Sequence, residues 1–164
     1  MSKFYRLTAD TDVAEYVRPA PTLYEEPCGE MTLAEAVRQG KAQFIDPAPL
    51  EVGVSDDGGL EFPDFLLYEG VPLFSAKFYD ELRKLNVYLP FCKQVTLKDD
   101  LLGYVEKYIL VVPPQVNALE EAGRYKLFVL PKTGTLVTTE EVKKAVVVLN
   151  LENVDFDEME ETSV

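Results

Sequence analysis

Short apolar runs, most of them closed by a proline, a glycine or a helix cap, fill residues 62–151 and restrict this part of the chain to short strands and helices. Residues 107–112 give the strongest strand signal, because aliphatic and β-branched side chains follow one another until Pro113-Pro114 ends the run. Strand and helix signals are mixed and lack the regular alternation of a parallel sheet built from βαβ units. We therefore predict the α+β class: a single domain with a mostly antiparallel sheet and a few short helices.

Other segments also have strand-like patterns. The further predicted strands are residues 4–7, 87–97 and 125–130. Pro90 lies at the edge or start of the second strand, and Pro131 ends the third. Two short apolar runs, residues 65–68 and 71–74, are separated by a turn at residues 69–70.

The clearest helix signal follows Ser75, which can cap a helix over residues 77–85. Phe78, Leu82 and Leu85 recur at the spacing of one helix face. This stripe predicts a helix that packs against the core.

Two further helices are predicted from capping signals. Thr32 and Glu35 have capping-box spacing, and Gly40 stops a short helix over residues 33–39. Thr138 or Thr139 can cap a helix that begins near Glu140. Whether residues 145–149 continue that helix or form a strand stays open, because three consecutive valines favour a strand.

The domain organisation follows from composition. Residues 1–151 are predicted to form one α+β domain, in which residues 1–61 are the proline-rich and least specified part and residues 62–151 are the core. Residues 152–164 contain six acidic and no basic residues, so we predict an acidic tail that frays in solvent.

The charge of the chain is strongly and unevenly negative. Acidic residues outnumber basic ones 29 to 16, and the net charge is −9 over residues 1–70, +2 over residues 71–151 and −6 over residues 152–164. Binding to phosphates needs clustered Lys and Arg, so nucleic acid and anionic membranes are disfavoured as partners. The charge favours a basic protein partner, although it can also serve solubility alone.

The sequence offers little catalytic machinery. The chain has no histidine, which excludes Ser-His-Asp and Cys-His sites, and it has no glycine-rich phosphate loop. Asp56-Asp57-Gly58-Gly59 lacks the ligand spacing of a calcium loop and predicts a surface turn. Cys28 and Cys92 are 64 residues apart and are interpreted as two reduced thiols. We therefore predict no catalytic residue, cofactor or metal, and a protein that is not an enzyme.

Several short motifs carry a resemblance to a known family. They are Pro-Asp-Phe at 63–65, Phe-Ser-Ala-Lys-Phe at 74–78, Tyr-Leu-Pro-Phe at 88–91, Tyr-Ile-Leu-Val-Val at 108–112, Tyr-Lys-Leu-Phe-Val at 125–129 and Leu-Val-Thr-Thr-Glu-Glu-Val-Lys at 136–143. Over roughly residues 60–148 the chain resembles a bacterial immunity-protein family of polymorphic toxin systems, first described as a domain of unknown function, whose type member is myxobacterial. The resemblance implies a cytoplasmic antidote that binds and neutralises a cognate toxin, and it transfers no catalytic residue.

An acidic surface would suit such a role. A toxin that acts on nucleic acid has a basic groove, and carboxylates can imitate the phosphates that this groove binds. The predicted partner-binding residues come from the N-terminal third and the tail: Glu25, Glu26, Asp56, Asp57, Asp155, Asp157, Glu158, Glu160 and Glu161.

Other functions stay open. The main alternative is a small-ligand or regulatory binding module, which would need an apolar pocket with a few converging polar groups. An enzyme that uses only carboxylates, or an oligomer joined through exposed aromatic residues, is also compatible with the composition. The N-terminal residues lack an apolar leader, and no run of 18 apolar residues occurs, so we expect a cytoplasmic location.

Overall fold

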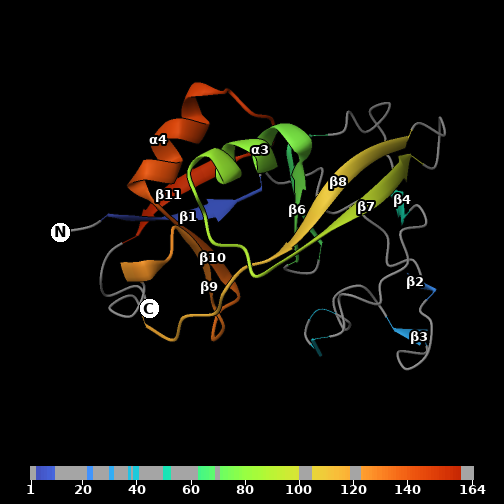
Figure 1. The fold of residues 1–164 in the computed structure, drawn as a ribbon, viewed down its shortest axis with the longest axis horizontal. Coiled ribbons are helices and arrows are strands. Elements are labelled where there is room, and N and C mark those ends of the chain that lie inside the picture. Colours follow the sequence, from blue (N-terminus) through green and yellow to red (C-terminus); the bar gives the residue numbers. More distant parts are fainter. Residues whose placement is uncertain are drawn as a thin grey trace.

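The described part of the fold, a computed structural model, contains two main sheets and two nine-residue helices (Figure 1). The structure describes residues 3–9, 22–23, 30–31, 37, 39–40, 50–52, 63–68, 71–99, 105–118 and 123–159. Within these residues no helix is both long and apolar enough to cross a membrane. The predicted α+β class, a single domain with mostly antiparallel pairing, is confirmed.

The larger sheet has five strands in the order β4-β7-β8-β6-β5. Their bounds are β4 Leu50–Val52, β5 Phe65–Tyr68, β6 Val71–Ser75, β7 Phe91–Asp99 and β8 Val105–Val112. All neighbouring pairs are antiparallel except β4 and β7. β7 and β8 form a long ribbon that extends away from the helices (Figure 1). Two short strands, β2 Thr22–Leu23 and β3 Glu30–Met31, form a separate antiparallel pair.

The smaller sheet has four antiparallel strands in the order β11-β1-β10-β9. Their bounds are β1 Phe4–Thr8, β9 Leu127–Leu130, β10 Thr135–Thr139 and β11 Asp155–Met159. The segment after β8 joins the two sheets, because the Val116 N–H donates to the Val129 carbonyl at 2.9 Å and the Val129 N–H donates to the Pro114 carbonyl at 2.9 Å. One continuous stretch of chain therefore takes part in both sheets.

Two nine-residue helices, α3 Ala76–Lys84 and α4 Glu140–Val148, pack against each other and against the strands that precede them. The predicted Ser75 cap of α3 is confirmed, since its hydroxyl accepts a hydrogen bond from the Phe78 N–H at 3.2 Å. The Lys126 ammonium donates to the Leu85 carbonyl at 2.6 Å and lies 3.2 Å from a carboxylate oxygen of Glu141. This lysine therefore ties the end of α3 to the start of α4.

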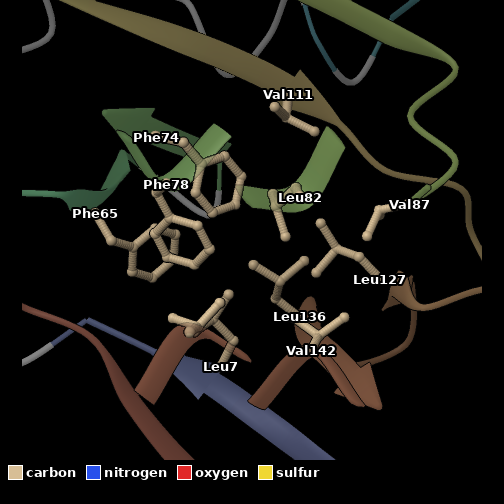
Figure 2. Packing of buried hydrophobic residues seen from close by; sticks show 11 residues of the cluster. Leu7, Phe65, Phe74, Phe78, Leu82, Val87, Val111, Leu127, Leu136 and Val142 are labelled. Atoms are coloured by element: carbon tan, nitrogen blue, oxygen red, sulfur yellow. The ribbon is translucent and has the colours of Figure 1, made fainter. Parts of the chain in front are cut away.

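The main hydrophobic core lies where side chains of both sheets and of both helices meet (Figure 2). Three aromatic rings from β5, β6 and α3 meet there, with the rings of Phe74 and Phe78 separated by 4.6 Å and those of Phe65 and Phe74 by 5.2 Å. Leu7 from β1 and Leu136 from β10 point into the same cluster from the other sheet (Figure 2). Because aliphatic and aromatic burial is the dominant favourable term in folding, this shared core holds the two sheets together.

A second, smaller cluster contains residues of the four-stranded sheet and of the segment before it. Its buried members are Val116, Phe128, Leu130, Val137 and Met159. The rings of Phe4 and Phe128 meet edge to face at 5.8 Å beside it. Leu136 and Val137 are adjacent on β10 but belong to different clusters, so both faces of this sheet carry buried apolar side chains.

Several local predictions are confirmed. Strands occupy the predicted regions 4–7, 107–112 and 125–130, with three of the six ends shifted by one or two residues. The open question at residues 145–149 is resolved in favour of a helix as far as Val148. The predicted helix over residues 33–39 lies mostly outside the described residues; Val37 is helical and Gly40 has a φ of 70°, as its role as a stop requires.

Other predictions need correction. The antiparallel strands form two main sheets where one was expected, and β10 was not predicted, because Thr135–Thr139 follows a turn and directly precedes α4. Residues 87–90 lie outside β7, which begins only after Pro90. The predicted fraying of the acidic tail is wrong for Asp155–Met159, which forms β11. A local composition that disfavours order is overridden there by pairing with β1.

Candidate protein-binding edge

The last strand of the fold, β11, brings part of the predicted acidic surface into a defined position. Three of the predicted partner-binding residues lie on it: Asp155, Asp157 and Glu158. All three are exposed, whereas Phe156 packs against the main core cluster and Met159 is 9% exposed within the second cluster. The apolar side chains fix the strand in the sheet, and the carboxylates project from it into solvent.

The register with β1 decides which carboxylates share a face. Asp157 lies opposite Arg6, and Asp155 lies opposite Thr8, two residues further along β1. Since residues directly opposite each other, and residues two apart on one strand, lie on the same face, Asp155 and Asp157 form a pair beside Arg6. Glu158 lies opposite Tyr5 and therefore belongs to the other face.

One cation just before β1 and another on α4 lie on the Glu158 side of this edge. The Lys3 ammonium is 3.8 Å from a carboxylate oxygen of Glu158, with side chains 57% and 60% exposed. Such an exposed pair stabilises the fold by only about 0–1 kcal/mol. The Lys143 ammonium lies 4.2 Å from the ring centre of Tyr5, on the Glu158 side of the sheet. Arg6 lies opposite Asp157 on the other face, so cations lie beside both faces of β11, and counting acids along the sequence overstates the negative charge of the edge.

Within the described residues, β11 is an edge strand that pairs on one side only, with β1. The outward backbone groups of an edge strand are available to another strand, and charged side chains discourage pairing with an identical edge. A second copy of β11 would place carboxylates against carboxylates, which is destabilising. A basic extended segment would meet the same edge with complementary charge.

The turn before β11 is held by a residue of the other sheet, Asp64. One carboxylate oxygen of Asp64 accepts a hydrogen bond from the Ser75 hydroxyl at 2.7 Å, and the other accepts from the Glu152 N–H at 2.8 Å. The Asp64 N–H donates to the Glu152 carbonyl at 3.2 Å, and the Asn153 amide donates to the Phe65 carbonyl at 2.8 Å. These contacts join segments almost ninety residues apart, so no sequence signal singled out Asp64 as important for the edge.

The other predicted acidic residues lie outside the described part of the chain. They are Glu25, Glu26, Asp56, Asp57, Glu160 and Glu161. The structure thus places three of the nine predicted residues on one strand, and the partner-binding role of all nine stays a prediction. No sequence signal identifies Lys3, Arg6 and Lys143 as neighbours of the edge, because only the strand register and the packing of α4 bring them there.

Elsewhere in the described residues, the Cys92 thiol and the hydroxyls of Tyr108 and Ser75 are partly buried or hydrogen-bonded. Burial raises the pKa of the Cys92 thiol, and the Tyr79 hydroxyl and Arg83 act in the opposite direction without reversing the shift. A thiol with a raised pKa is mostly protonated near neutral pH and is a weak nucleophile. The Tyr108 hydroxyl donates to the Pro63 carbonyl, and burial raises the pKa of this tyrosine well above its usual value. Ser75 is occupied as the α3 cap and as a donor to Asp64.

The described residues offer little to a metal ion or a small ligand. They contain no group of three or more His, Cys, Asp or Glu side chains placed to hold a metal ion. A cavity of about 260 Å³ is lined by Asn117, Leu130, Pro131, Lys132 and Thr133 at the turn between β9 and β10. Pockets for small ligands usually measure about 300–1,000 Å³, so this cavity is small for the ligand-binding alternative.

Comparison with known proteins adds no relative. No protein-family model and no curated protein matches this chain. The resemblance to the immunity-protein family therefore stays a prediction that depends on the short motifs alone.

Proposed function

We propose that this chain is a cytoplasmic immunity-type protein that binds a cognate toxin and neutralises it without catalysis. The observation that supports the proposal most directly is the acidic β11 edge, where Asp155 and Asp157 share one face of an edge strand. A charged edge on a folded sheet suits a binding protein, because the carboxylates are already in place before a partner arrives.

Electrostatic attraction would guide the encounter with a basic toxin surface. Complementary fields raise association rates by roughly 10–10³-fold, and salt weakens the effect. After the encounter, backbone groups of β11 could pair with an extended segment of the toxin, while Asp155 and Asp157 contact its Lys or Arg side chains. Covering the basic groove of the toxin would then exclude its substrate.

The proposal is tested first by finding the partner and then by changing the edge. The product of a reading frame directly adjacent to the gene is the first candidate. Purified wild-type protein is compared with the Asp155→Asn, Asp157→Asn double variant for association with that toxin. We expect association to slow by about tenfold in the double variant, and to slow further as NaCl rises from about 50 mM to about 500 mM.

A matched control removes two negative charges elsewhere. Asp80 on α3 and Glu106 on β8 are both exposed, so the Asp80→Asn, Glu106→Gln variant has the same net charge as the edge variant. We expect this control to bind and neutralise the toxin like the wild type. Equal slowing of association in both variants would mean that only the net charge matters, and it would reject β11 as the binding edge. Failure of the wild-type protein to protect cells that express the toxin would reject the immunity function.

A further inference from the structure

Asp64 occupies a junction between the two sheets. It lies immediately before β5 in the five-stranded sheet, while its carboxylate contacts both the cap of α3 and the turn that leads into β11 of the four-stranded sheet. A carboxylate suits this place because both of its oxygens accept hydrogen bonds, and here each oxygen accepts from a donor of a different segment. Hydrogen bonds to an ionised group are also stronger than those between neutral groups.

The turn itself is short and conformationally demanding. Between the end of α4 and the start of β11, Asn150 and Asn153 have φ values of 52° and 63°, in the left-handed region. Asparagine adopts this region more readily than most residues. The Asn153 side chain adds a second link to β5 through the Phe65 carbonyl. The direction in which the chain enters β11 is thus set by contacts with the other sheet.

We infer that Asp64 is the positioning residue of the β11 edge: it locks the turn at Glu152 to the α3 cap, so that the five-stranded sheet determines where the acidic edge lies. The consequence for partner binding depends on the function proposed above, whereas the structural lock does not. β11 is only five residues long and pairs with one neighbour among the described strands, so an additional anchor at its first end has a large effect on its local opening.

Hydrogen exchange measured residue by residue tests the lock. In Asp64→Ala, we expect the β11 amides that are protected in the wild type to exchange about tenfold faster, as for the loss of one hydrogen bond to a charged group. Amides in β7, which β8 separates from β5 and β6 in the sheet order, serve as the internal reference and should keep their rates. Uniform acceleration in both sheets would mean that Asp64 supports only global stability and would overturn the inference.

Two further variants separate the arms of the lock. Ser75→Ala removes the α3 arm but leaves the Glu152 N–H bonded to Asp64, so the first turn of α3 should loosen while β11 keeps its protection. Asp64→Asn can still accept from Glu152 through its amide oxygen and donate to Ser75, so it should restore most of the protection that alanine loses. Loss of β11 protection in Ser75→Ala equal to that in Asp64→Ala would overturn the assignment to Asp64.

The binding consequence is measured separately. If the toxin partner is found, Asp64→Ala should weaken its binding while Asp64→Asn does not. Faster exchange of β11 with unchanged toxin binding would confirm the lock and reject β11 as the binding edge. If the β11 amides of Asp64→Ala exchanged at the same rates as in the wild type, the lock would be rejected, whatever the result for toxin binding.

Discussion

The segment of β6 and α3 and the strand β11 are specified in opposite ways. Residues 71–85 contain an apolar run, a serine cap and a helical stripe within fifteen positions, and the structure follows each of these local signals. Residues 155–159 contain three acids among five residues and have a composition that favours fraying, yet they form a strand. The difference shows that order at β11 comes from its neighbours, since Leu7 lies opposite Phe156 and Phe4 lies opposite Met159.

The largest expected effect comes from a substitution in the core that the two regions share. Phe74→Ala should lower the free energy of unfolding by about 3–5 kcal/mol, because its ring is fully buried between Phe65 and Phe78. Urea-induced unfolding followed by circular dichroism measures the change. The control is Tyr88→Ala. Because Tyr88 is 56% exposed, this substitution should lower the free energy of unfolding by less than about 1 kcal/mol. Similar losses for both variants would contradict the placement of the core.

A smaller effect tests whether β11 is a strand or a frayed tail. Met159→Ala should lower the free energy of unfolding by about 2 kcal/mol, since Met159 is 9% exposed and belongs to the cluster with Phe128 and Val137. Asp157→Asn on the same strand removes an exposed charge and should change stability by no more than about 0.5 kcal/mol. If Met159→Ala changed the free energy of unfolding as little as Asp157→Asn, the segment would be frayed as its composition suggests.

The smallest effect concerns β10, which lies between β1 and β9 in the four-stranded sheet. The Thr138 side chain is fully buried, and its hydroxyl has no hydrogen-bond partner among the described residues. Thr138→Val keeps the shape and removes the unsatisfied group, so it should raise the free energy of unfolding by about 1 kcal/mol. In the control Thr135→Val, the lost hydroxyl is 2.6 Å from the Thr133 hydroxyl, so stability should fall slightly. A loss of stability in Thr138→Val would show that its hydroxyl is satisfied in solution.

The candidate site was only partly predictable. The carboxylates of Asp155, Asp157 and Glu158 were chosen from charge alone, and that choice found residues that share one strand. Their division between two faces, and the cations beside them, depend on the register with β1. Asp64 entered only as part of the Pro-Asp-Phe motif, because a single aspartate before an apolar run says nothing about a turn almost ninety residues later.

The sequence by itself determined the elements whose signals lie within a few residues: the capped helix α3, the proline-terminated strand β8, and the α+β class that follows from their mixture. Only the tertiary structure decided that the strands separate into two sheets, that Thr135–Thr139 and Asp155–Met159 are strands, and that β1 lies between them. The physical reason is the range of the interactions. Caps, turns and helical stripes act between near neighbours, whereas β1 and β11 gain their hydrogen bonds and buried contacts only after segments about 150 residues apart have met.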